Sequence, residues 1–230
     1  MLVRSLLFLF IMFGSCTYSM AQFGVSGIYN FHQGADVWDN EINSNAEHIK
    51  SDGFGVSLNY WFRLKDYRVE FLPELMYLAG NRSAALLDDT PIDHEWQQLA
   101  LYFNVNIYPF DFEGDCNCPT FGKDGGFFEK GFFFQLSPGA GYYINETKSS
   151  EARESSGVAF LSGIGAGLDV GVAEYFTITP FVRYVIGFNT EWPQSDPTNA
   201  DEGNSIQSST RDFLAGLNVI YRFDYKKRRF

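Results

Sequence analysis

Apolar and polar residues alternate strictly along residues 54–77, where two runs meet at a short polar break at residues 65–66. In each run, alternate positions are almost all apolar or aromatic. The positions between them hold mostly small, polar or charged residues, with Trp61, Leu72 and Met76 as exceptions. A period of two over about ten residues is typical of a β-strand, and a short polar break is typical of a hairpin. The pattern therefore predicts two antiparallel strands that share one apolar face and one polar face.

The same alternation recurs along the rest of the chain and predicts eight strands. The predicted strands cover residues 23–32, 54–64, 69–77, 96–109, 132–145, 157–170, 176–188 and 212–225. Pro73, Pro138 and Pro180 fall inside three of them. We expect β-bulges there, because proline cannot donate a hydrogen bond to a neighbouring strand.

Long polar segments alternate with shorter connections between these strands. The four long segments cover residues 33–52, 79–95, 145–156 and 189–210. Long loops at one end and short turns at the other are typical of outer-membrane barrels, whose apolar positions face lipid and whose polar positions face the lumen. We therefore predict an all-β fold, an eight-stranded antiparallel up-and-down transmembrane β-barrel. Its long loops lie outside the cell, and both termini lie in the periplasm together with one long loop.

A soluble barrel or sandwich exported to the periplasm is the alternative, with its apolar faces packed inward. Its outward faces should then be rich in charge, whereas the polar positions here are mostly Gly, Ser, Asn and Gln. Aromatic residues gather near the predicted strand ends, where membrane barrels carry interfacial girdles. The membrane barrel is therefore the preferred interpretation. The predicted girdle residues are Tyr60, Phe62, Tyr77, Tyr108, Phe110, Tyr142, Tyr175, Phe188, Tyr221 and Phe223.

The first 21 residues have the features of a secretory signal peptide. Arg4 supplies the positive charge, an apolar stretch follows, and a small-residue cleavage site ends at Ala21. A lipoprotein signal that ends at Cys16 is the alternative. The barrel is then expected at residues 22–225, followed by a basic C-terminal tail at residues 226–230. A bacterial outer membrane is the expected location.

The cleavage site, the eight strands and hairpins such as LNYWFRLKDYRVEFLPELMY resemble the small outer-membrane barrels of Bacteroidota, of the PorT-like and OmpX-like kind. The resemblance covers the whole mature chain, and its motifs are general to barrels. Some members of this group serve type IX secretion or other envelope machines, and others have no known role. The resemblance implies an architecture and carries over no catalytic residues.

The connection at residues 110–131 breaks the pattern, because it is long where a short periplasmic turn is expected. Long loops without structure of their own are often functional, so we treat it as a candidate partner-binding loop. The two cysteines allow three interpretations: a strained disulfide, half of a metal site, or a loop without chemistry. The phenylalanines fit either a protein partner or the lipid interface. The candidate residues are Cys116, Cys118, Phe121, Phe127 and Phe128.

Six charged residues fall on the face that the pattern assigns to the lumen. They are Arg63, Glu70, Glu74, Asp169, Arg183 and Arg222. A barrel of eight strands has an interior just wide enough for side chains to fill it, and charges buried there must pair. We predict a plug of salt bridges, with a gated small pore as the alternative.

The composition and the histidines narrow the function. A net charge of −11 argues against nucleic acid as a partner. His32, His48 and His94 fall in polar segments or at strand ends, without a recognisable nucleophile motif, so we expect no enzyme and no metal or other cofactor.

Two hypotheses for the function remain. The first is an accessory or interaction subunit of an envelope machine, for protein secretion such as type IX or for outer-membrane protein assembly. Its partners would be outer-membrane lipid and other outer-membrane or periplasmic proteins, which bind through residues 110–131. The second is a stand-alone barrel for membrane integrity, adhesion or small-solute passage.

Overall fold

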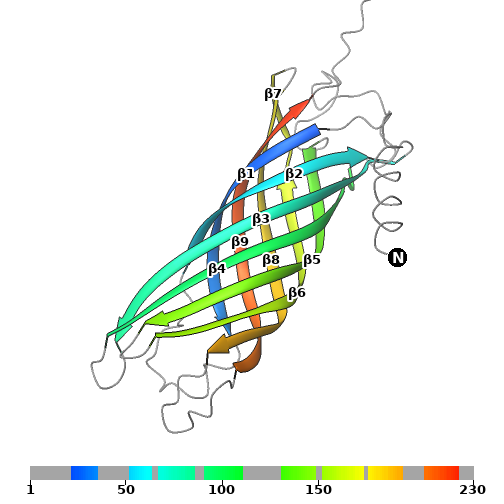
Figure 1. Ribbon diagram of the computed structural model, residues 1–230. Helices are drawn as coiled ribbons and strands as arrows, with labels where there is room; N and C mark the ends of the chain where they lie inside the picture. The colour runs from blue at the N-terminus through cyan, green and yellow to red at the C-terminus, as the bar shows by residue number, and fades with distance from the viewer. Residues whose placement is uncertain are drawn as a thin grey trace, which may run out of the picture.

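The computed structural model describes residues 22–35, 52–63, 67–85, 91–110, 131–148, 152–173, 176–193 and 205–222. These residues form one antiparallel sheet that closes into a tall, tilted barrel (Figure 1). None of the described residues forms a helix long and apolar enough to cross a membrane. The strands are β1 (Gln22–Ala35), β2 (Gly53–Arg63), β3 (Val69–Ala85), β4 (Pro91–Ile107), β5 (Phe132–Lys148), β6 (Ala152–Leu168), β7 (Val170–Ala173), β8 (Phe176–Pro193) and β9 (Ser205–Arg222).

Closure of the barrel depends on β1 and β8. β1 pairs with β9 along its whole length, from Gln22 opposite Arg222 to Ala35 opposite Thr210. β6 and β7 pair with successive parts of β8, so together they make one strand of the wall, interrupted at Asp169. The described wall therefore has eight strands, and the predicted eight-stranded antiparallel barrel is confirmed. We call the end where β1 begins and β9 ends the terminal end, and the opposite end the hairpin end.

Several strands reach further towards the hairpin end than the sequence pattern predicted. β3 continues to Ala85 and β4 begins at Pro91, so the prediction of a polar connection over residues 79–95 was wrong for most of that range. β5 and β6 likewise extend into the predicted segment 145–156. Backbone groups pair whatever the side chains are, so these hairpins continue where the exterior is no longer apolar.

The three prolines interrupt hydrogen bonding without a bulge, so the expectation of bulges was wrong. The register continues unshifted through Pro73 opposite Phe103 and through Pro180 opposite Leu217. Proline lacks an N–H group, and the cost appears on the other side of the strand. There, β2 and β3 lack paired residues between Asn59 and Phe62, although the register is the same on both sides of the gap.

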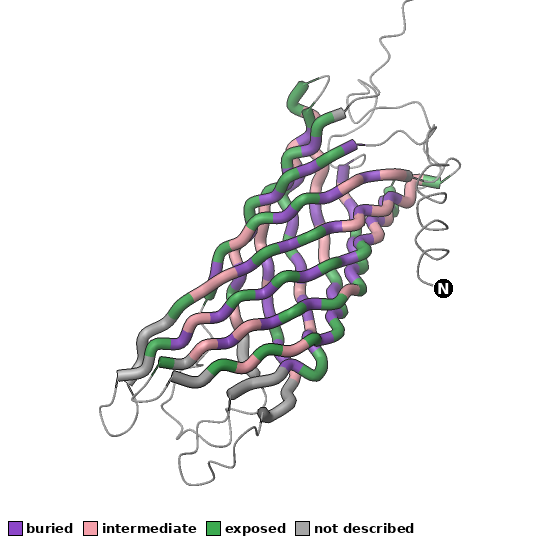
Figure 2. Tube along the Cα trace, viewed as in Figure 1, coloured by how far each residue is buried: buried purple, intermediate pink, exposed green. Residues whose placement is uncertain are grey.

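The wall has an apolar exterior and a polar interior, and buried and exposed residues alternate along its strands (Figure 2). On β2, for example, Phe54, Val56 and Leu58 are 72%, 59% and 61% exposed, whereas Ser57 and Asn59 between them are buried. Soluble proteins rarely expose continuous apolar surface of this extent. Closed barrels with an apolar exterior are a form in which β-strands span membranes. The chain is therefore an outer-membrane β-barrel.

Aromatic side chains pack against one another on the exterior near the terminal end. The ring centroids of Phe23 and Tyr60 lie 5.2 Å apart, and those of Phe62 and Phe71 lie 5.3 Å apart. The prediction of Tyr108 as a girdle residue was wrong, because its side chain is fully buried in the lumen. Tyr108 follows the lumen-facing alternation of β4, and its hydroxyl group finds hydrogen-bond partners there.

The exterior changes character towards the hairpin end. On β4 the outward positions change from the apolar Leu99 and Leu101 to Glu95 and Asp93. Lys148 Nζ donates a hydrogen bond to Glu95 at 2.8 Å, which raises the pKa of the lysine. We call this charged group the acidic rim, which consists of Asp93, Glu95, Glu146, Lys148 and Glu154.

Candidate functional site

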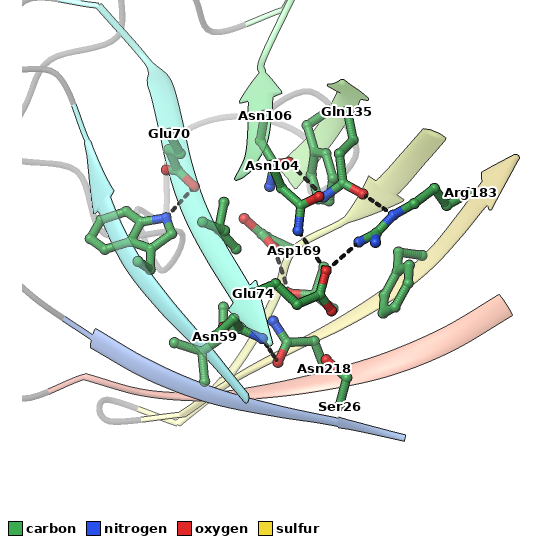
Figure 3. A pocket seen from close by; sticks show the side chains of 16 residues that line it. Ser26, Asn59, Glu70, Glu74, Asn104, Asn106, Gln135, Asp169, Arg183 and Asn218 are labelled. Atoms are coloured by element: carbon green, nitrogen blue, oxygen red, sulfur yellow. Dashed lines mark hydrogen bonds and ion pairs between the residues drawn. The ribbon is translucent and has the colours of Figure 1, made fainter. Parts of the chain in front are cut away.

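The candidate site is the polar interior of the barrel, to which several strands each contribute side chains. Alternation along a strand sends every second residue inward. Glu70 and Glu74 of β3, Gln135 of β5 and Arg183 of β8 therefore converge from different parts of the wall (Figure 3). All four residues are at most 5% exposed.

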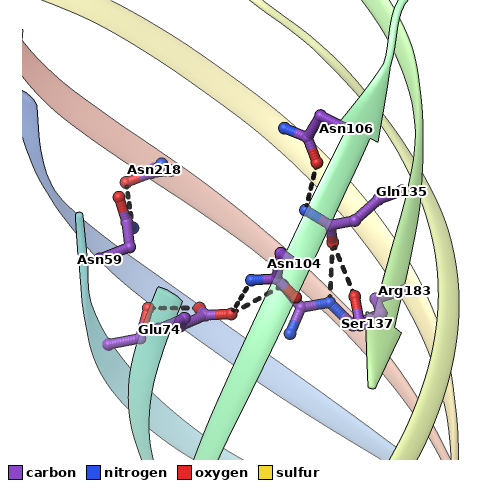
Figure 4. Close-up of polar contacts among 9 residues, drawn as sticks. Asn59, Glu74, Asn104, Asn106, Gln135, Ser137, Arg183 and Asn218 are labelled. Atoms are coloured by element: carbon purple, nitrogen blue, oxygen red, sulfur yellow. Dashed lines mark hydrogen bonds and ion pairs between the residues drawn. The ribbon is translucent and has the colours of Figure 1, made fainter. Parts of the chain in front are cut away.

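An ion pair between Glu74 and Arg183 forms the centre of the lumen. Arg183 Nη2 lies 2.9 Å from Glu74 Oε2, and the two side chains are each 2% exposed. The carboxylate also accepts hydrogen bonds from Ser57 Oγ and Asn104 Nδ2, each at 2.6 Å. A buried ion pair is tolerated when its remaining lone pairs are satisfied in this way. The pair joins β3 to β8 directly across the interior (Figure 4).

Amide side chains extend this network around the lumen. Gln135 Oε1 accepts a hydrogen bond from Arg183 Nε, and Gln135 Nε2 donates to Asn106 Oδ1, both at 2.9 Å. Asn59 Nδ2 donates to Asn218 Oδ1 at 3.1 Å across the strand between them (Figure 4). The interior is therefore held by directed contacts both between neighbouring strands and across strands that are not neighbours in the wall.

A second cluster lies at the terminal end, and we call it the root cluster: Glu70, Tyr108 and Asp169. Tyr108 Oη lies 2.7 Å from Glu70 Oε2 and 2.5 Å from Asp169 Oδ2. Trp61 Nε1 donates to Glu70 Oε2, and Thr179 Oγ1 donates to Asp169 Oδ1, both at 2.5 Å. Sequence analysis assigned the two acids to the lumen but missed Tyr108, although it continues the inward alternation of β4.

Aromatic rings fill space that the polar groups leave, and lumen glycines make room for them. A Cβ atom added to Gly216 would lie 2.5 Å from the ring of Phe181, and one added to Gly80 would lie 2.5 Å from the indole of Trp96. A real Cβ does not fit at such distances, so each ring lies directly on the backbone of the neighbouring strand. These two glycines thus serve packing.

The cavity that remains between the ion pair and the root cluster is small. It measures about 20 Å³, and Asn59, Glu70, Glu74, Asn104 and Arg183 are among its lining residues (Figure 3). This volume is room for about one water molecule. The residues that line this cavity therefore leave no space there for a larger solute.

For the other predicted site residues, the structure describes either the backbone alone or nothing. Arg63 stands opposite Glu70 in the β2–β3 register, and Arg222 stands opposite Gln22, but the side chains of both arginines are outside the described ones. The predicted loop residues Cys116, Cys118, Phe121, Phe127 and Phe128 lie outside the described residues. So do the predicted signal peptide and C-terminal tail. Among described residues, no group of three His, Cys, Asp or Glu side chains is placed to hold a metal ion.

The histidines include one acid-paired imidazole that sequence analysis missed. His32 Nδ1 lies 2.8 Å from Asp212 Oδ1, which also accepts a hydrogen bond from Asn30 Nδ2 at 3.2 Å. Such a pair can orient an imidazole for catalysis. Here the side chains of His32 and Asp212 are 1% and 5% exposed, so a substrate outside the barrel cannot reach them. The pair therefore serves to join β1 to β9.

Comparisons with known proteins bear on the fold. No family model matches the sequence, and no curated protein matches it. The chain is similar in structure to a major outer membrane protein from Thermus thermophilus, with 13% identity, a TM-score of 0.50, and coverage of 88% of this chain and 99% of that one. This similarity supports the fold of a small outer-membrane barrel.

Two further solved structures match over similar lengths. Neisserial surface protein A has 11% identity and a TM-score of 0.45, with coverage of 89% of this chain and 98% of that one. Ail of Yersinia pestis, solved with the heparin analogue sucrose octasulfate, has 10% identity, a TM-score of 0.47, and coverage of 88% and 98%.

Proposed function

We propose that the protein is a non-enzymatic outer-membrane barrel that acts as an interaction subunit of an envelope machine. The machine would serve protein secretion, such as type IX, or outer-membrane protein assembly. The resemblance to PorT-like and OmpX-like barrels of Bacteroidota, which rests on sequence, supports this class of role. The partner would bind through the connection between β4 and β5, which contains Cys116 and Cys118.

The observation that best supports this proposal is how both ends of that connection are fastened to the wall. Tyr108, its first residue after β4, bonds to Glu70 and Asp169. Gly131, its last residue before β5, accepts a hydrogen bond from the Asp169 backbone N–H at 2.9 Å. Fixing both ends of a connection lowers the entropy cost of binding a partner to it.

The filled lumen supports the same proposal, because it favours a function at the outer surfaces of the barrel over transport through its interior. The cavity of about 20 Å³ between the ion pair and the root cluster is too small for a solute larger than water. Function through contacts outside the lumen then fits better than transport.

The experiment removes residues 115–126 and leaves the fastened ends in place. Native envelopes that carry the tagged protein are extracted in mild detergent, and the proteins that co-purify are identified. We expect large outer-membrane or periplasmic proteins in fixed ratio with the full chain, and their loss from the deletion variant. The control is a deletion within residues 194–204, in the connection between β8 and β9, which should retain the partners.

A stand-alone barrel is the second candidate, and the acidic rim favours it. The rim has four carboxylates and one lysine on the exterior of β4, β5 and β6, beyond the apolar belt. Glu95 stands directly opposite Glu146, which in turn stands opposite Glu154. Like charges that face each other across strands lower the stability of the sheet. A basic partner would relieve this repulsion, so the rim is suited to bind one. Recovery of the full chain alone, as a heat-modifiable monomer, would favour this candidate over a machine subunit.

A further inference from the structure

The oxygen atoms of Glu70, Tyr108 and Asp169 form a continuous hydrogen-bonded line at the terminal end of the lumen. Tyr108 Oη lies between the other two, 2.7 Å from Glu70 Oε2 and 2.5 Å from Asp169 Oδ2. Both distances are those of hydrogen bonds between oxygen atoms. Each hydrogen bond needs its own proton, so this line of three oxygens holds two bridging protons.

Tyr108 supplies one of these protons and cannot supply the other. A phenol has a single O–H, and an ionised carboxylate can only accept. The donors Trp61 and Thr179 approach Glu70 and Asp169, but neither lies between a carboxyl group and the phenol. The second bridging proton must therefore come from one of the two carboxyl groups.

We propose that Glu70 and Asp169 together hold one proton at neutral pH, bound through Tyr108, so that the root cluster is a proton-binding site. The phenol of Tyr108 lies between the two carboxyl groups, so the proton belongs to the pair. In the unfolded chain the same carboxyl groups ionise near about pH 4. Folding at neutral pH then takes up one proton.

Two arginines lie near the cluster and can offset its negative charge, but a guanidinium keeps its protons and so does not supply the bridging one. Arg68 Nε is 4.0 Å from Glu70 Oε1, which is too far for a hydrogen bond, and its guanidinium lies 4.1 Å from the centre of the Tyr108 ring. Arg183 of β8 also lines the cavity, but it is paired with Glu74 at 2.9 Å.

Other elements around the cluster contribute neutral groups or arginines at register positions. Asn106 of β4, Gln135 of β5 and Asn218 of β9 line the same cavity and are uncharged. Arg63 stands opposite Glu70 on β2. On β9, Arg222 lies at the terminal end opposite the first residue of β1.

The bound proton also joins separate parts of the wall. Glu70 lies near the start of β3, Tyr108 directly after β4, and Asp169 at the joint between β6 and β7. The Asp169 backbone holds Gly131 as well. Loss of the proton would leave two carboxylates beside one phenol O–H, which can donate to only one of them, and this would weaken this end of the barrel. The site requires no partner protein, so a test of proton binding does not depend on the proposed function.

The test compares the full-length barrel with Glu70→Gln in lipid vesicles, by urea unfolding between about pH 5 and about pH 9. The folded state binds more protons than the unfolded state, so stability falls as pH rises until the bound proton is lost. We expect the wild-type midpoint to decrease across this range. In Glu70→Gln an amide N–H takes the place of the proton, so the decrease should be absent or much smaller.

Infrared spectroscopy provides a second readout that does not depend on unfolding. The folded wild-type barrel at neutral pH should show the carbonyl band of a protonated carboxyl group. Glu70→Gln and, if that variant does not fold, Asp169→Asn should lack it. Glu95→Gln in the acidic rim is the matched control and should leave the band and the pH slope unchanged. Equal slopes in wild type and Glu70→Gln, with no such band in the wild type, would overturn the proposal.

Discussion

Arg183 makes more contacts in the lumen than its single charge requires, and each contact reaches a different strand. It pairs with Glu74 on β3, donates to Gln135 on β5, and lies 5.0 Å from the centre of the Tyr102 ring on β4. A planar guanidinium with several fixed donors suits this role better than an ammonium group. One residue thus connects strands on opposite sides of the barrel.

We expect Arg183→Met to lower the free energy of unfolding by about 3–5 kcal/mol, because Glu74 would remain buried without its cation. Urea unfolding of the lipid-reconstituted barrel, followed by tryptophan fluorescence, measures this change. The double variant Arg183→Met with Glu74→Gln is the control, and it should recover much of the loss. A loss below about 1 kcal/mol in the single variant would show that the buried pair contributes little.

At the scale of elements, the packing of aromatic rings on neighbouring strands depends on the positions of the glycines. Gly216 of β9 lies under the Phe181 ring of β8, whereas Gly27 of β1 has nothing within 4 Å of its added Cβ. Gly216→Ala should therefore destabilise the barrel by about 1–3 kcal/mol through overpacking. Gly27→Ala should be neutral or stabilise it by about 0.5–1 kcal/mol, because alanine restricts the unfolded chain. The two variants are compared by the same urea titration.

The discriminating result is a loss of stability in Gly216→Ala that Gly27→Ala does not show. If both substitutions changed stability equally, the position of the ring would not matter. The sequence places glycine frequently on the polar faces of the predicted strands, but it does not reveal which ring lies on which glycine. That depends on how far each strand is shifted along its neighbour.

The alternation of apolar and polar residues predicted the strands because lipid and lumen impose opposite chemistry on the two faces of the wall. Where the exterior reaches water, as at Glu95 and Lys148, that contrast disappears while the backbone pairing continues. This is why the sequence placed a loop at residues 79–95, where the structure has paired strands. Tyr108 was misplaced for a different reason, because aromatic residues at strand ends suit an interface as well as a lumen.

At the scale of the whole molecule, the lumen contacts could be predicted only as a set of residues. The phase of each strand assigned Glu74 and Arg183 to the interior, but they are 109 residues apart in the chain. Which inward residues meet depends on the tilt and stagger of the closed barrel. The sequence contains both charges, but the register of all the strands between them determines that they pair.

The filled lumen predicts that the barrel does not conduct ions. The purified protein, inserted into a planar lipid bilayer under applied voltage, should give no stable conductance steps, because the Glu74–Arg183 pair joins opposite sides of the lumen and the cavity that it lines measures about 20 Å³. Truncation of both side chains, in Glu74→Ala with Arg183→Ala, removes the central contacts and should produce a measurable leak in protein that still folds. Regular steps from the wild type would instead identify a pore, and the lumen rather than the outer surfaces would then carry the function.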